Sequence, residues 1–118
     1  LMVGLSTHVL DTSSGKPAYN LKIILFSIQK DELLKIDTFV TNKDGRISNL
    51  LLSGNSFIKG KYELHFHVGE YFNNNDISLP DIKFLDIVKI SFGIANDKEH
   101  YHVPLLVSPY GYSTYRGS

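Results

Sequence analysis

The sequence contains no cysteine and no tryptophan, and its 12 Lys and Arg residues are balanced by 12 Asp and Glu residues. Without cysteine the chain can form no disulfide, no thiolate nucleophile and no thiolate metal site. Because the formal net charge is zero, the chain also lacks the positive field on which sequence-independent binding of nucleic acids or anionic membranes depends. We therefore expect no nucleic acid partner and no membrane partner.

Long hydrophobic runs are also missing. Lys, Asp or Gly interrupts every apolar stretch well before the roughly 18 residues that a membrane-spanning helix requires. The length of 118 residues suits one hydrophobic core and is too short for two, so we predict a single domain over residues 1–118.

Alternation of apolar and polar residues with a period of two dominates the chain. In Tyr62–Val68 the apolar side chains share one face and the charged and histidine side chains share the other, which is typical of a half-buried strand. Three further segments favour strands, the last with less regular alternation: Leu21–Gln29, Ile87–Ile94 and Leu33–Val40. Turn-forming residues separate these segments at short intervals, which predicts an all-β sandwich, with room for a short helix at Gly69–Asn75.

Two His-x-His pairs occur, His65/His67 and His100/His102. Residues two apart on a strand point to the same side, so each pair could offer two imidazoles to one metal ion. A zinc site needs further ligands, and none lies at a diagnostic spacing, so we expect no metal and keep a zinc hydrolase as an alternative. His102 precedes the apolar stretch Val103–Val107, at the rim of a buried region, and the proline in that stretch favours an edge strand or an interface.

His8 has a comparable setting within Leu5–Asp11, where alternation places it on one side with Ser6 and Leu10. Imidazole titrates close to neutral pH, which makes His8 and His102 candidates for a general base. A single histidine in a strand is more often a hydrogen-bonded structural residue than a catalyst, so both interpretations stay open on pattern alone.

The end of the chain is rich in tyrosine, with three of them among the last nine residues. Chain ends fray unless a strand pairing or a buried contact holds them, so this composition predicts a docked final strand. Taken by itself, Arg116 is most simply part of a surface ion pair.

Three motifs are familiar in combination: Leu5–Asp11, Asp44-Gly45-Arg46, and the run from His100 to Ser118. Together they resemble the 5-hydroxyisourate hydrolases, the enzymatic relatives of transthyretin, and the resemblance covers essentially the whole chain. The closing Tyr-Arg-Gly-Ser is specific, because the hormone-carrying transthyretins lack it.

The resemblance implies a transthyretin-like sandwich of two four-stranded sheets with one short helix. Members of the family dimerise edge to edge and pair these dimers into a homotetramer around a central channel that holds the active sites. The implied reaction is the hydrolytic opening of the ring of 5-hydroxyisourate in urate degradation, with no cofactor. Bacterial members occur in the cytoplasm or, with a leader, in the periplasm, and the absence of cysteine leaves both compartments open.

The resemblance also carries roles over to individual positions. The implied catalytic residues are His8, Arg46, His102, Tyr115 and Ser118. The implied substrate-binding residues are His8, Arg46, Tyr115, Arg116, Gly117 and Ser118. His65, His67 and His100 receive no role. A non-catalytic carrier that holds an aromatic ligand in the same channel is the alternative function.

Alternation agrees with such a site. If His102 faces the channel, His100 does so too, and Tyr115 and Gly117 share one face of the last strand. Glycine at position 117 would let a planar ligand approach the backbone closely. Arg116 points away from Tyr115, so it either contacts substrate or fixes the end of the chain.

Overall fold

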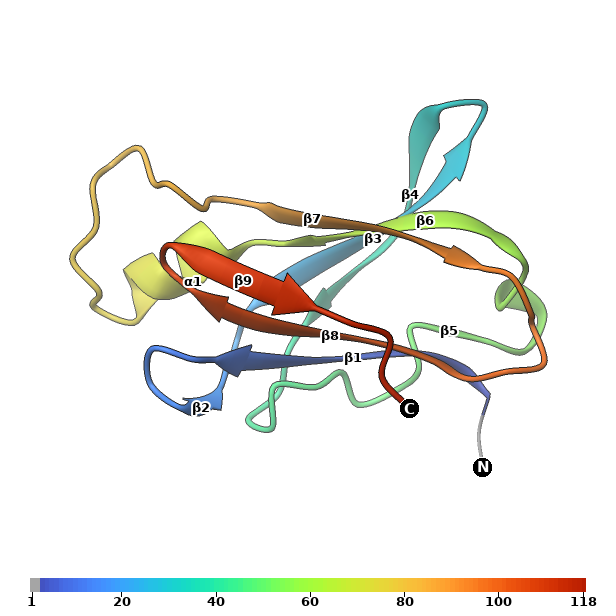
Figure 1. Cartoon of the computed structure of the whole chain (residues 1–118), viewed down its shortest axis with the longest axis horizontal. Coiled ribbons are helices and arrows are strands. Elements are labelled where there is room, and N and C mark those ends of the chain that lie inside the picture. The colour runs from blue at the N-terminus through green and yellow to red at the C-terminus, as the bar shows by residue number, and fades with distance from the viewer. Residues whose placement is uncertain (1–2) are drawn as a thin grey trace.

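A computed structural model describes residues 3–118, whose strands form two sheets packed face to face (Figure 1). One sheet has the order β4-β3-β6-β7 and consists of β3 (Lys22–Gln29), β4 (Glu32–Val40), β6 (Gly60–Phe66) and β7 (Val88–Ile94). The other has the order β2-β1-β8-β9 and consists of β1 (Gly4–Asp11), β2 (Lys16–Pro17), β8 (Tyr101–Ser108) and β9 (Gly111–Thr114). The short strand β5 (Leu52–Ser53) also pairs with β1 and leads into a single 3₁₀ turn at Gly54–Ser56.

The predicted sandwich with a short helix is confirmed. Helix α1 (Val68–Asn74) begins one residue before the predicted segment, and β3 and β7 match their predicted segments to within one residue. Strand β6 ends at Phe66 because the chain enters α1 at that point. Among residues 3–118, no helix is long and apolar enough to cross a bilayer. That residues 1–118 form one domain stays a prediction.

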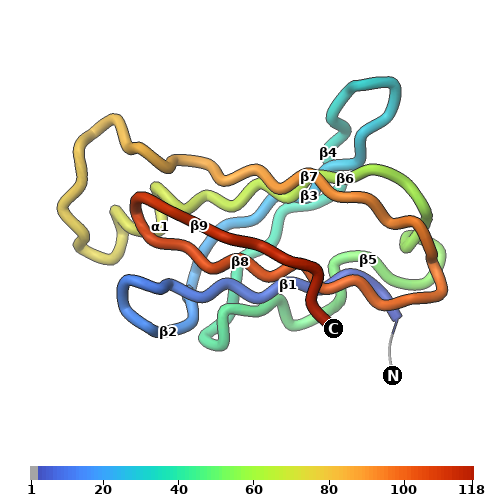
Figure 2. The backbone as a smooth tube through the Cα atoms, viewed as in Figure 1, coloured from blue at the N-terminus to red at the C-terminus, as the bar shows by residue number. Residues whose placement is uncertain are grey.

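Strand β4 alternates poorly in sequence because most of its side chains are exposed, so neither of its faces is reserved for the core. With β3 it forms a hairpin whose tip projects away from the rest of the sandwich (Figure 2). The tip residues Lys30 and Asp31 both have positive φ, as a tight two-residue hairpin turn requires.

The core lies between the sheets and is built from the inward-facing residues of both. Its fully buried members on the central strands include Leu5, Val9, Ile23, Leu25, Leu64, Phe66, Leu105 and Val107. Strands β1 and β8 run parallel and side by side, and they pair Ser6 with His102 and His8 with Pro104 (Figure 2). The residues between the core positions of these two strands therefore face outward together.

Strand β8 lies between β1 and β9, so the expectation that its proline marks an edge strand was wrong. The continuous β8–β9 ladder ends at the pair of Leu105 with Thr114. Pro104 lies one residue beyond this end. The N–H that Pro104 lacks therefore falls outside that ladder. The Thr114 hydroxyl donates to the Pro104 carbonyl oxygen at 2.7 Å and fastens β9 at this point. The predicted docking of the tyrosine-rich end on a neighbouring strand is confirmed by β9.

Candidate active site

Two rows of side chains cross the outer face of the sheet that contains β1 and β8. In one row, Arg46 is bridged to His8, which pairs with Pro104. In the next row, Ser6 pairs with His102, which is bridged to Gly117. Paired residues on neighbouring strands point to the same side of a sheet. Four of the predicted site residues, His8, Arg46, His102 and Gly117, are therefore brought together here.

A tight turn after β4 fixes the backbone of Arg46 beside β1. The side-chain oxygen of Asn42 accepts a hydrogen bond from the Arg46 backbone N–H at 3.1 Å, and Val9 N–H donates to the Gly45 carbonyl at 2.9 Å. Gly45 has φ of 72°, and a Cβ there would lie 2.4 Å from the Val9 carbonyl oxygen. Only glycine meets both demands, which explains the Asp-Gly-Arg sequence of this turn.

His102 is held on both flanks of its ring. Its Nδ1 lies 2.8 Å from the Ser6 hydroxyl oxygen, and a Cβ built on Gly117 would lie 2.4 Å from its Cδ2. Gly117 N–H also donates to the His102 carbonyl oxygen at 2.8 Å. The absence of a side chain at Gly117 thus makes room for the His102 ring. The close approach of a planar ligand to this glycine stays a prediction.

Burial and positive charge act together on the two histidines. Desolvation first, and then the Arg46 guanidinium, lowers the pKa of His8 below 6.5, while the backbone carbonyl of Asp44 opposes this shift. Desolvation likewise lowers the pKa of His102, followed by the charges of Arg46, His100 and His8, while a hydrogen bond to the Ser6 backbone opposes this shift. The lowered pKa values favour the neutral form of both imidazoles near pH 7. In this form a histidine has one nitrogen to accept a proton and one to donate a hydrogen bond.

Tyr115 and Ser118 lie at the border of this face. The pairing of Leu105 with Thr114 and the bridge between His102 and Gly117 have the same register, which places Tyr115 across from Pro104. Tyr115 is 61% exposed, and Ser118 is exposed beside Gly117. Tyr115 also lines a hollow between β7 and the end of the chain, together with Phe92 and Tyr101.

Arg116 is not brought to the same place. Its Nη2 donates to the His100 carbonyl oxygen at 3.2 Å and to Glu99 Oε1 at 3.3 Å. The guanidinium lies 4.0 Å from the centre of the Tyr101 ring, and Tyr101 is a core residue. These contacts anchor the end of the chain to the start of β8. A contact between Arg116 and substrate stays a prediction.

Sequence reasoning placed Ser6 on the face of His8 and His100 on the face of His102 but gave neither a role. The Ser6 hydroxyl oxygen lies 2.8 Å from His100 Nε2 as well as 2.8 Å from His102 Nδ1, and Gly4 N–H donates to His100 Nδ1 at 3.2 Å. The parallel register of β1 and β8, which joins these faces, is not visible in the sequence.

The second His-x-His pair has a different environment. His65 is 8% exposed, its Nε2 lies 2.8 Å from Glu63 Oε1, and its ring centre is 4.4 Å from that of Phe26. His67 is the N-cap residue of α1. Within residues 3–118, no group of three or more potential metal-binding side chains is clustered at either pair or elsewhere.

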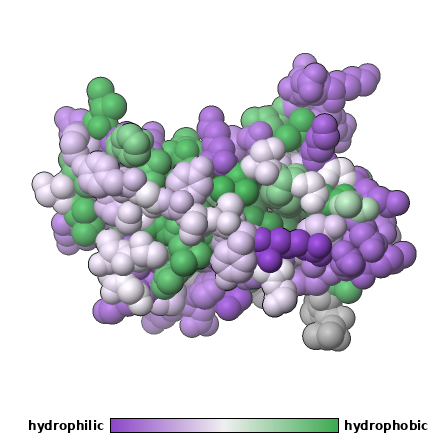
Figure 3. All heavy atoms as spheres, viewed as in Figure 1, coloured by the Kyte–Doolittle hydropathy of each residue, from purple (hydrophilic) through white to green (hydrophobic). Residues whose placement is uncertain are grey.

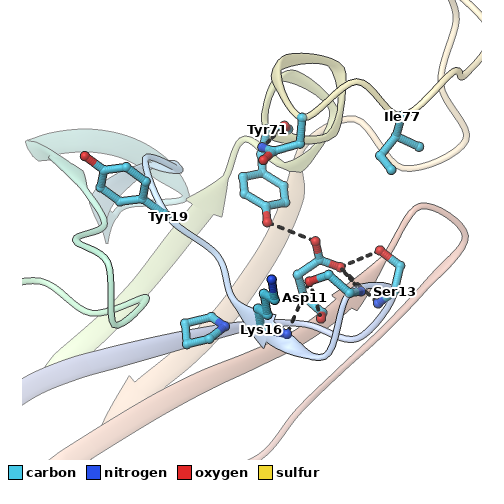
Figure 4. Close-up of a pocket in the computed structure, with 9 residues that line it drawn as sticks. Asp11, Ser13, Lys16, Tyr19, Tyr71 and Ile77 are labelled. Carbon is cyan, nitrogen blue, oxygen red and sulfur yellow. Dashed lines mark hydrogen bonds between the residues drawn. The ribbon is translucent and has the colours of Figure 1, made fainter.

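A hollow of about 420 Å³ lies beside Asp11 and Tyr71, away from the histidines (Figure 4). The Tyr71 hydroxyl donates to Asp11 Oδ2 at 2.9 Å, and Ser13 N–H donates to Asp11 Oδ1 at 2.9 Å. Burial, together with the hydrogen bond to Asp11, raises the pKa of Tyr71. These polar groups are engaged in tying α1 to the end of β1, so the hollow has a structural explanation.

Comparison with known proteins agrees with this geometry. The 5-hydroxyisourate hydrolase 2 of Rhizobium meliloti (strain 1021) is 54% identical over 114 residues, which cover 97% of this chain and 95% of that protein. The structure of Klebsiella pneumoniae 5-hydroxyisourate hydrolase superposes with a TM-score of 0.77 at 34% identity and covers 98% of this chain and 94% of that one. Sea bream transthyretin in complex with thyroxine superposes with a TM-score of 0.85 at 29% identity and covers 96% of this chain and 93% of that one. A profile of the HIUase/Transthyretin family matches residues 5–117, and the chain belongs to this family.

Proposed function

We propose that this chain is a 5-hydroxyisourate hydrolase, which opens the ring of its substrate in urate degradation by adding water at a cyclic amide-like carbonyl. The observation that carries the proposal is the meeting of two imidazoles, His8 and His102, with Arg46 on one sheet face. A non-catalytic carrier has no use for three such groups, because they are costly to desolvate. The hydrolase names of relatives at 54% and 53% identity support the enzymatic reading.

The side chains present suit this chemistry. One neutral imidazole takes a proton from water, whose oxygen then bonds to the carbonyl carbon as the ring C–N bond breaks. The planar fork of Arg46 matches the oxygens of a flat purine-like ring and the negative charge that builds on the carbonyl oxygen. Tyr115 supplies a hydroxyl and a ring wall, and Ser118 supplies a hydroxyl contact. No step requires a cofactor.

The proposed assembly is a homotetramer, a dimer of dimers, in which the exposed histidine face lines a central channel. Strands β7 and β9 form the outer edges of the two described sheets, and they border a shared cavity of about 240 Å³. An exposed sheet edge is a template for pairing with another chain. Apolar side chains also gather on the surface over the loop between α1 and β7 (Figure 3), where Ile82 and Phe84 are exposed. A small-molecule substrate is the expected partner, with no nucleic acid or membrane.

Freshly generated 5-hydroxyisourate loses its ultraviolet absorbance on hydrolysis, which provides the test. The purified protein should accelerate this loss well beyond spontaneous decay, and a rate equal to spontaneous decay would overturn the proposal. A carrier would bind an aromatic ligand but would not accelerate the loss of absorbance. Activity that survives treatment with a chelator separates this mechanism from that of a zinc hydrolase.

A further inference from the structure

A chain of hydrogen bonds runs from the backbone of β1 to the ring of His102. Gly4 N–H points at Nδ1 of His100, so that nitrogen accepts and carries no proton. The proton of a neutral His100 ring is then on Nε2, which donates to the Ser6 hydroxyl oxygen at 2.8 Å. Ser6 is left with its own proton to donate, and Nδ1 of His102 lies 2.8 Å away.

These donor and acceptor roles determine the tautomer of His102. Because Nδ1 of His102 accepts the Ser6 proton, the ring proton of neutral His102 is on Nε2. In the reverse arrangement both imidazoles would donate to the Ser6 oxygen. The Ser6 proton would then have no acceptor among the side-chain contacts of residues 3–118.

The packing of the ring leaves the same atom available. Ser6 covers the Nδ1 flank of His102, and Gly117 lies against the Cδ2 flank so closely that no Cβ would fit. The remaining tip of the ring carries Nε2. His102 is half-buried on the outer face of the sheet, so this tip is the part of the ring that a bound substrate can meet.

We propose that Ser6 and His100 are positioning residues that hold His102 with its proton on Nε2, so that His102 meets substrate as a neutral hydrogen-bond donor and His8 acts as the base. This inference rests on the proposed function. The proton of the attacking water goes to His8 and is returned to the ring nitrogen when the C–N bond breaks, so atoms and charge balance. His102 donates a hydrogen bond to the developing oxyanion without transferring its proton, and neutral imidazoles are known to polarise carbonyl groups in this way.

The tautomer can be measured without any substrate. Long-range proton–nitrogen correlation spectra of protein labelled at histidine report which ring nitrogen carries the proton, and the His102 signals are identified by their loss in His102→Gln. We expect a proton on Nε2 and an accepting Nδ1 near neutral pH. A proton on Nδ1 would overturn the inference even if the protein is an active hydrolase. An inactive wild-type protein with the expected tautomer would instead overturn the proposed function.

Kinetic measurements test whether the hydrogen bonds from His100 through Ser6 to His102 affect turnover. Ser6→Ala and His100→Ala should lower kcat by about 10- to 100-fold with little change in KM, the range for loss of outer-shell partners. Ser6→Thr keeps the hydroxyl and His100→Gln keeps a donor near the Nε2 position, so both should restore most of kcat. Ser27→Ala, a half-buried serine on β3 of the other sheet, is the matched control and should leave kcat unchanged. Values of kcat for Ser6→Ala and His100→Ala equal to that control, or an effect on KM alone, would overturn the positioning role.

Discussion

The two His-x-His pairs have the same local pattern and opposite surroundings. His102 lies on the outer face of its sheet near Arg46, and its ring touches a hydroxyl on one flank and a glycine on the other. His65 is buried against Phe26 and satisfied by a carboxylate two residues away on its own strand. The spacing of two is common to both, so the neighbouring strands decide what each pair can do.

The strand beside each pair accounts for the difference. Parallel pairing with β1 supplies a serine and a second histidine to the face of His102. Antiparallel pairing places Ile24 of β3 on one side of His65 and Lys89 of β7 on the other. An apolar neighbour encloses a ring, and a polar neighbour gives it hydrogen bonds that orient it. A histidine with a carboxylate partner inside its own strand has a structural explanation, while one with polar partners from distant strands is a candidate for chemistry.

The sharpest way to break this comparison is to remove each histidine in turn. His102→Ala and His8→Ala should lower kcat by about 10²- to 10⁴-fold, the usual contribution of a positioned acid or base. His65→Ala should leave kcat intact and reduce the free energy of unfolding by about 1–3 kcal/mol, because it removes a buried hydrogen-bonded group. The ultraviolet decay assay and denaturant unfolding measure the two quantities. Loss of turnover in His65→Ala at full folding would contradict the distinction.

Substitution of Arg46 tests how its positive charge affects His8 and His102. Arg46→Gln should cost about 10²- to 10³-fold in kcat, as loss of an oxyanion donor does. Because the positive charge of Arg46 lowers the pKa of His8 and His102, its removal should move the acid limb of the pH–rate profile to higher pH. Arg46→Lys keeps the charge and loses the fork, so its limb should stay in place while kcat falls. An acid limb at the same pH in the wild-type protein, Arg46→Gln and Arg46→Lys would contradict the effect of Arg46 on the two histidines.

The glycine beside His102 tests its packing. In Gly117→Ala the new Cβ would meet the His102 ring, and a displacement of about 1 Å can cost about 10²-fold in rate. Gly111→Ala in β9 is the matched control, since the nearest atom to its Cβ is 3.9 Å away and its φ is not positive. Turnover rates of the two variants provide the comparison, and equal rates would show that the ring tolerates displacement.

The smallest expected effect concerns stability as a function of pH, where His8 and one histidine of each pair, His67 and His102, have pKa values shifted in the same direction. Burial lowers the pKa of His8, His67 and His102 below 6.5, so below that value the unfolded chain binds more protons than the folded one. The free energy of unfolding should therefore fall from about pH 7.5 to about pH 5.5. Replacement of all three by Asn should flatten this fall in denaturant titrations, and an unchanged slope would contradict the assigned shifts.

The sequence predicted more of the fold than of the candidate site. Alternation in β6 and the apolar, β-branched composition of β3 and β7 are local signals, and they located these three strands. The motif resemblance placed His8 and Arg46 in the site, and the bridge between them agrees. The contacts of Ser6 with His100 and His102 were not predicted, because a parallel register between distant strands depends on packing across the sheet, which no local pattern records. The edge-strand interpretation of Pro104 failed for the same reason, and its alternative, an interface, stays a prediction.

The parallel pairing of β1 with β8 has a consequence for the order of synthesis. Ser6 and His102 are 96 residues apart, whereas β3, β4, β6 and β7 are joined by shorter connections. A nascent chain that has emerged only through β7 already has every strand of one sheet, but β1 still lacks β8, its parallel neighbour. Closing so long a loop carries an entropic cost that local hairpins avoid. The face that carries His8, His102 and Gly117 therefore forms only after the segment through Gly117 has been synthesised.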